Sequence, residues 1–511
     1  MKMRELSKAM ASIGLVSLAL GVEAQTAETA STQTSTATAQ AAVANAGAPS
    51  ILQHLVERAI TSHPEINARY HDFVSTLEDQ NVARAGWRPQ VTAQAWTGRE
   101  WRSHIENTPS YDWGRHGWSL ELRQLLFDGG ATTNRIRQFG FEKLAKYYDI
   151  RSTSNNLANE AVAAYLDVQR YRAMESLAKE NYAMHATTLN QLRERSESGV
   201  GRGVDMEQAS GRLSLAQTNL MTESNNLNDV TQRFRRVLGE YPPEAMPPLP
   251  EVSEGLPVIG QTQDFSDAIR SSPAILSKQA LVQAAQAGRQ VAQAAYAPTV
   301  DLRASTGRDR ENPGALNRDV QSSRVQLMLT YPLYRGGADA ARIRQTAAQT
   351  YAAQDVLDYT CRNVQQEMSI AWNNIVRLRQ QLPFMREHEL STAKVRVAYL
   401  QQFRIGQRSL LDLLDTENEL FDARRAMMNA EYDLKKAEYY WLSLANRVLP
   451  SLGLAEPYAD KQPDEHKALV LPEDPLNACM DTLPNTSNLT PVAVNNRTTP
   501  SAPLSQQRSS Y

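Results

Sequence analysis

Two stretches of the chain carry apolar residues at alternating spacings of four and three, the pattern of a coiled-coil seam. The first series is Leu157, Ala161, Ala164, Val168, Tyr171, Ala178, Tyr182, His185, Leu189 and Leu192. The second series is Val364, Met368, Ala371, Ile375, Leu378, Leu382 and Met385. A helix over residues 131–195 would be roughly 95 Å long. Since no single compact domain has a core of that length, these helices are expected to pack along one another.

Shorter stretches alternate apolar and polar residues with a period of two. Their apolar members are Trp118, Leu120 and Leu122, then Val300, Leu302 and Ala304, then Val325, Leu327, Leu329 and Tyr331. This period predicts strands with one apolar and one polar face, each with about the 9–11 residues of a transmembrane β-strand. The polar loops at 103–115 and 307–320 fit exposed tips. The alternative is a soluble hairpin over a core, but the long helices already pack on each other and leave it no partner.

The second half of the chain repeats the first at an offset of 207 residues, and of 209 further upstream. Residues 134–138 match residues 341–345, and Pro64 matches Pro273. A repeat this long indicates a duplicated architecture rather than a short solenoid unit. Each copy is expected to run helix, strand pair, very long helix, turn and helix.

The repeat also gives the expected domain organisation. Copy one spans residues 50–239, with a hairpin at about 90–127. Copy two spans residues 263–449, with a hairpin at about 299–334. A proline-rich linker at 240–262 joins the two copies.

The N-terminal residues 1–24 predict a cleaved secretory signal. Three basic residues precede a short apolar run, and Val22-Glu23-Ala24 is a small-x-small cleavage site. The alternative is a membrane anchor, but the run is shorter than the ~20 residues that a spanning helix needs. Residues 25–49 are rich in Ala, Thr, Ser and Gln and form a low-complexity segment with nothing to bury.

The C-terminal residues 450–511 are polar and predict a disordered tail. The chain has two cysteines, Cys361 and Cys479, and the second lies in that tail. We therefore expect no disulfide framework, and stability must come from packing and assembly.

Composition leaves the class of protein open. The chain is 41% hydrophobic and has a formal net charge of −2. After the signal it has no apolar stretch of about 18 residues, but alternating strands do not register in hydropathy averages. The near-zero charge gives no reason to expect nucleic acid as a partner.

Four strands in one chain cannot close a barrel, and open sheet edges are not tolerated in hydrocarbon. The smallest membrane barrels need about eight strands. If these strands span a membrane, the protein must be an oligomer. Two chains would supply eight strands and three would supply twelve, and strand arithmetic does not choose between them.

The most specific motif is the turn over residues 403–415. Gly406 can end the long helix, and Ser409 can cap the next one. Asp412 then lies in the first turn, where its charge suits the helix dipole, and Asp415 shares its face at i+3. By spacing alone, the alternative is a solvated helix N-terminus.

The duplication, the strand pairs and this turn together resemble the TolC family of outer-membrane export ducts, over about residues 50–450. The resemblance implies an α+β membrane protein in which antiparallel coiled-coil helices form a periplasmic α-barrel. Three chains would close a 12-stranded β-barrel and a twelve-helix tunnel. Asp412 and Asp415 match the acidic rings of the tunnel's constriction, so they are expected to attract cations, and crowding is expected to raise some of their pKa values.

The resemblance also implies a gate latch. Arg408 matches an arginine that links the inner helix pair to its neighbours. Phe403 stands where the family has a tyrosine, and its partner matches Asp205, with Val204 in place of a threonine. The tyrosine–aspartate link is therefore lost, and either the closed state is looser or other residues hold it.

Docking of an adaptor is expected at the helix-turn tips. The residues are Gly199, Gly203, Gly406, Ser409 and Leu410. The glycines at 199–203 do not form a phosphate loop, because no strand precedes them and their spacing is wrong.

The resemblance implies a homotrimeric outer-membrane channel that contacts outer-membrane lipid. Its partners would be a periplasmic adaptor and an inner-membrane ABC transporter or RND-type pump. Residues 415–420 resemble members that serve type I protein secretion, and small-molecule efflux is the alternative. A periplasmic coiled-coil rod or adaptor is a third candidate, but it would need no strands. No histidine pair has metal-ligand spacing and no serine lies in a nucleophile elbow, so we expect no enzyme, metal or cofactor.

Overall fold

The structure is a computed structural model of the chain. It describes residues 51–102, 111–199, 202–249, 252, 255–257, 263–311, 318–461, 471 and 474–479. The predicted signal at 1–24 and the low-complexity segment at 25–49 lie outside these residues. The described residues belong to one compact unit.

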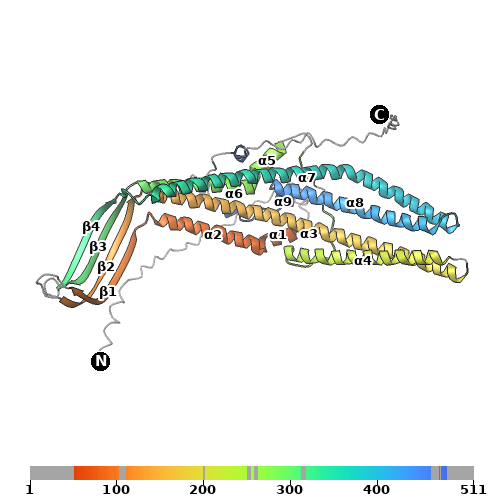
Figure 1. Ribbon diagram of the computed structural model, residues 1–511, viewed down its shortest axis with the longest axis horizontal. Coiled ribbons are helices and arrows are strands. Elements are labelled where there is room, and N and C mark those ends of the chain that lie inside the picture. The colour runs from red at the N-terminus through yellow and green to blue at the C-terminus, as the bar shows by residue number, and fades with distance from the viewer. Residues whose placement is uncertain are drawn as a thin grey trace, which may run out of the picture. The chain divides into compact units, whose positions relative to one another are not determined.

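The two copies have the predicted order of elements (Figure 1). Copy one comprises α1 (Ile51–Ser62), α2 (Pro64–Ala85), β1 (Gln90–Arg102), β2 (Tyr111–Phe127), α3 (Ala131–Glu197) and α4 (Gly203–Leu238). Copy two comprises α5 (Gln263–Ser271), α6 (Pro273–Gln293), the 3-10 turn η1 (Ala294–Tyr296), β3 (Thr299–Glu311), β4 (Arg318–Thr330), α7 (Ala338–Arg404) and α8 (Leu410–Leu444). Three short helices follow, α9 (Val448–Ser451), η3 (Ala459–Lys461) and α10 (Pro475–Ala478). The predicted loops were too long, because residues 111–115, 307–311 and 318–320 continue the strands.

The four strands form one antiparallel sheet in the order β1-β2-β3-β4. The register pairs Val91 with Leu122 and Leu302 with Leu327, so the apolar residues of neighbouring strands share one face. The other face carries ion pairs, among them Arg123 to Asp301 at 3.0 Å. The alternation in the sequence therefore produces the two-faced sheet that it predicts.

The long helices pack side by side, α3 against α2, α4 and α6, and α7 against α6 and α8. One apolar core joins the two copies. At its centre the Trp441 ring lies 4.8 Å from Phe265 and 6.2 Å from Trp372, measured between ring centroids. The coiled-coil seams predicted for both long helices supply buried residues such as Ala161 and Ile375.

No helix among the described residues is both long enough and apolar enough to cross a membrane.

The described part of the proline-rich linker is fixed to α3 by hydrogen bonds to its carbonyl groups. The Tyr165 hydroxyl donates to the Pro247 carbonyl at 2.7 Å, and Arg172 donates to the Pro243 carbonyl at 2.8 Å. Burial raises the pKa of Tyr165 to about 12, so this hydroxyl keeps its proton for the bond. The described part of the linker thus lies against α3.

The prediction of a disordered tail from residue 450 is wrong for residues 450–461 and 474–479. The Tyr458 ring stacks on Tyr70 with centroids 4.3 Å apart, and Arg151 contacts Glu456 at 2.5 Å. The segment is polar on average, but its few apolar side chains pack against helices that composition does not reveal. Residues 480–511 lie outside the described part of the chain.

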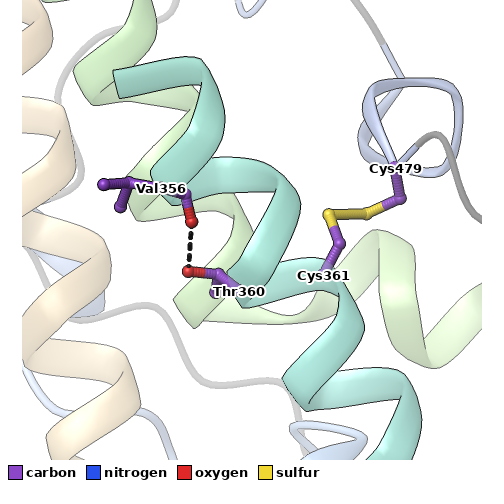
Figure 2. Close-up of a disulfide and its surroundings, with 4 residues drawn as sticks. All are labelled: Val356, Thr360, Cys361 and Cys479. Atoms are coloured by element: carbon purple, nitrogen blue, oxygen red, sulfur yellow. Dashed lines mark hydrogen bonds between the residues drawn. A yellow bond between two sulfur atoms is a disulfide. The ribbon is translucent and has the colours of Figure 1, made fainter. Parts of the chain in front are cut away.

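The expectation of no disulfide framework is also wrong. Figure 2 shows a disulfide between Cys361 of α7 and Cys479, which follows α10. Cys361 is 1% exposed on the inner side of its helix, and the two Cα atoms are 5.7 Å apart. Nearby, Arg270 of α5 holds Asp474 at 2.9 Å. The fold of the C-terminal segment brings together two cysteines that are 118 residues apart.

Candidate gate at the helix tips

Figure 1 shows the turns α3–α4 and α7–α8 at the ends of the long helices, away from the sheet. In the second turn Gly406 has a φ of +76°, a conformation that glycine adopts at low cost. The Gln407 N–H donates to the Gln402 carbonyl at 2.9 Å, and the Gly406 N–H donates to the Phe403 carbonyl at 3.1 Å. These bonds satisfy carbonyls at the end of α7 and form a Schellman motif.

Ser409 caps α8, as the sequence predicts. Its hydroxyl accepts a hydrogen bond from the Asp412 N–H at 3.1 Å. The cap satisfies one free N–H of the first turn and fixes the direction in which α8 leaves the turn.

Asp412 is partly exposed and sits beside its own cap. Hydrogen bonds with Ser409 and the charge of Arg408, 3.6 Å away, lower its pKa below the ordinary value. Within one chain this direction is opposite to the rise expected from crowding in an acidic ring. Asp412 is therefore a charged group that local contacts hold in place.

Arg408 makes its contacts within the second hairpin, α7 and α8. Its Nε donates to the Gln402 side chain at 3.0 Å, and its guanidinium lies 4.3 Å from the centre of the Tyr399 ring. Among the described residues, the contacts of Arg408 thus lie within the turn and its two helices.

The Phe403 side chain has no hydroxyl, but its ring still contacts copy one. It packs on a small cluster, which we call the tip cluster: Leu189, Leu192, Met206, Ala209, Leu410 and Leu414, with Phe403 itself. The Arg195 guanidinium of α3 lies 5.4 Å from the centre of the Phe403 ring, a cation–π distance. Among the described residues, the Asp205 carboxylate makes no hydrogen bond or ion pair, and the structure does not bring it to Phe403. Phe403 is thus held against copy one by apolar packing and a cation–π contact.

The glycines of the tips are exposed, whereas one expected docking residue is not. Gly199 has a φ of +82° and ends α3, and Gly203 begins α4. Leu410 is 4% exposed, because it is part of the tip cluster. The expectation that Leu410 offers a docking surface is wrong, and its neighbour Leu411 is the exposed leucine at this turn.

Sequence reasoning missed the partner of Asp415. The Arg212 guanidinium of α4 contacts the Asp415 carboxylate of α8 at 2.5 Å. Further along the same two helices, Arg425 contacts Glu223 at 2.7 Å. No sequence signal could have given these pairs, because they join helices from different copies.

Residues 415–420 mainly hold the second hairpin together. Thr416 and Leu420 are buried, and the buried Glu417 carboxylate pairs with Arg396 of α7 at 2.6 Å. Asp415 and Glu419 are the exposed acidic residues of this segment.

The family described as outer membrane efflux protein matches residues 55–240 and 265–440. The chain belongs to this family. The two matched ranges correspond to the two copies of the repeat. The predictions of a duplicated export-channel fold and of an outer-membrane location are confirmed.

Three relatives show the range of the family. The outer membrane efflux protein BepC of Brucella suis is 28% identical, covering 76% of this chain and 84% of that protein. The outer membrane protein TolC of Escherichia coli is 23% identical, covering 75% and 79%, so the predicted resemblance to TolC is confirmed. The alkaline protease secretion protein AprF of Pseudomonas aeruginosa is 23% identical, covering 73% and 80%.

Among solved structures, the CmeC outer membrane channel of Campylobacter jejuni matches with a TM-score of 0.70 at 15% identity. The match covers 78% of this chain and 86% of that one. This likeness shows the fold alone.

Proposed function

We propose that this chain is the outer-membrane channel of a tripartite export system. It works as a trimer with a periplasmic adaptor and an inner-membrane transporter. Membership of the outer membrane efflux protein family and the relatives' names support this role.

The sheet is the observation that carries the proposal. Its order leaves β1 and β4 each paired on one side only in the described chain. Val325, Leu327 and Leu329 of β4 are exposed on its apolar face. Because backbone groups cannot stay unpaired in hydrocarbon, β4 of one chain must pair with β1 of the next chain in the oligomer. Three chains supply twelve strands, with the apolar faces toward lipid.

We place the gate at the helix tips. Asp412 and Asp415 form the acidic constriction, Arg408 holds the turn between the paired helices, and Asp205 lies in the first turn of α4. Gly199, Gly203, Gly406 and Ser409 form the exposed turns on which the adaptor docks. Carboxylates around a narrow axis would make the channel prefer cations.

For the cargo, we favour a protein secreted by a type I system with an ABC transporter. This choice rests on the resemblance of residues 415–420 and on the likeness to a protein named for protease secretion. The second candidate is small-molecule efflux with an RND-type pump, which the name of BepC favours.

The test compares a deletion strain with its complemented parent for proteins in the culture supernatant. Loss of one secreted protein, restored by complementation, supports type I secretion and identifies the cargo. An unchanged supernatant together with increased sensitivity to toxic compounds would replace secretion by efflux. Wild-type behaviour in both assays would contradict the export role.

A further inference from the structure

Within the described residues, four ion pairs join helix α8 of copy two to copy one. From the tip toward the middle of the molecule they are Arg212–Asp415, Arg425–Glu223, Arg170–Asp433 and Lys436–Asp167. The charges on α8 alternate in sign along this row. The row therefore fixes the register of α8 against α3 and α4 and also opposes their separation.

The outermost pair of this row is the one in which neither side chain is largely buried, whereas each inner pair contains one partner that is at most 14% exposed. At the tip the Arg212 and Asp415 side chains are 32% and 56% exposed. In the next pair Glu223 is 4% exposed, and at the inner end Asp167 is 6% exposed. Water screens the outermost pair most, whereas breaking an inner pair would leave a buried charge without its partner. The two hairpins, α3–α4 and α7–α8, therefore separate most easily at Arg212 and Asp415.

Apolar contact between the hairpins is also interrupted near the tip. A groove of about 500 Å³ lies between α3 and the α7–α8 hairpin, next to the tip cluster. Its lining includes Met184 from α3, Arg396 from α7, and Glu417 and Phe421 from α8. Among the described residues, the tip cluster and the Arg195–Phe403 contact lie beyond it, so the ion pair is one of the few contacts that join the hairpins at their ends.

We propose that Arg212 is the counter-charge of Asp415, an inference that rests on the proposed gate. While the hairpins are together, Arg212 neutralises the Asp415 carboxylate. When they part, the carboxylate is released into the constriction. Asp412 keeps its own partners in the turn and is charged in both states. Since Asp412 stays beside Arg408 in both states, the entrance of the closed channel presents less uncompensated acidic charge than that of the open one, and the preference for cations increases on opening.

The experiment measures conductance and reversal potential of the full-length trimer in planar bilayers under a KCl gradient. In Arg212→Gln, Asp415 is uncompensated and the hairpins lose their link. We expect the ratio of potassium to chloride permeability to rise by about two-fold or more, together with the resting conductance. Arg233→Gln is the matched control. It removes the same charge from an exposed site of α4 that makes no ion pair within the described residues, and it should behave as wild type.

Two further variants separate charge from mechanical linkage. Asp415→Asn leaves Arg212 uncompensated and lowers the permeability ratio below that of wild type. Arg212→Gln combined with Asp415→Asn restores the wild-type ratio, because the net charge is unchanged, while the conductance stays raised. Arg212→Lys retains the charge at this site and keeps the wild-type ratio.

The inference is overturned if Arg212→Gln matches Arg233→Gln, or if its conductance rises without a change in the permeability ratio. A wild-type protein that forms no pore would instead contradict the proposed channel, and the inference would fail with it. The two failures are therefore distinguishable from the wild-type trace alone.

Discussion

The middle of the molecule and the helix tips are held together by different forces. In the middle, one apolar core with Phe265, Trp372 and Trp441 at its centre spans both copies, and a disulfide joins the C-terminal segment to α7. At the tips, a few residues of the tip cluster are buried, and the partly exposed Arg212–Asp415 pair and the Arg195–Phe403 contact add to them. Each fully buried large apolar side chain contributes about 1.5–3 kcal/mol, whereas an exposed ion pair contributes about 0–1 kcal/mol.

This difference fits a channel that opens at one end. The middle resists separation of the two copies because separation would expose a large apolar area. The tips can part at a small free-energy cost, because few apolar contacts are lost there. The same long helices are therefore held firmly together in the middle and only weakly at the tips.

The largest expected effect comes from truncating the centre of the core. Trp441→Ala removes a fully buried ring and leaves a cavity, which lowers the free energy of unfolding by about 3–5 kcal/mol. Trp441→Phe is the control, and it should cost less, since the indole N–H has no hydrogen-bond partner among the described residues. Thermal unfolding followed by circular dichroism measures both. Equal losses would show that ring packing does not hold this region.

The disulfide should give the next largest effect. Replacing both Cys361 and Cys479 with Ser removes a cross-link that closes a long loop in the unfolded chain, at a cost of about 2–4 kcal/mol. The double variant should melt below wild type without reductant and at the same temperature with or without it. Conductance should not change, because the bond lies in the rigid middle. A wild-type melting curve that is insensitive to reductant would contradict this.

We expect the free energy of unfolding to depend on pH through His185. Burial and then the charge of Arg212 lower the pKa of His185, so the unfolded chain binds a proton before the folded chain does. The stability contribution is complete above the ordinary pKa of about 6.5 and is lost as the pH falls toward the lowered value. Melting midpoints between about pH 8 and pH 5 should fall more in wild type than in His185→Phe. Parallel curves for the two proteins would rule out His185 as the source.

The smallest change in stability, less than about 1 kcal/mol, is expected from Arg408→Ser, because this arginine is partly exposed and its contacts lie within one turn. The resting conductance should nevertheless rise, since the turn loses its contacts with Gln402 and Tyr399. Arg404→Ser, at the exposed end of α7, is a control for the loss of charge. Unchanged single-channel conductance in Arg408→Ser would count against Arg408 as a latch.

The features that were predictable from the sequence are those that depend on neighbours in the chain. The periods of two and of alternating four and three predicted the strands and the seams, and the repeat predicted two copies. The glycine and serine of the α7–α8 turn predicted its helix end and cap, since both act through hydrogen bonds within a few residues. The choice of twelve strands over eight came from resemblance to a family.

The contacts between distant segments became visible in the folded chain. Composition predicted a disordered tail over residues 450–511, but the fold gives Tyr458 and Cys479 partners on helices far away in the sequence. Likewise, spacing placed Leu410 and Asp415 at the tip but did not show that Leu410 is buried or that Arg212 faces Asp415. A local pattern fixes which face of a helix a residue occupies, whereas its partner depends on which helix the fold packs against that face.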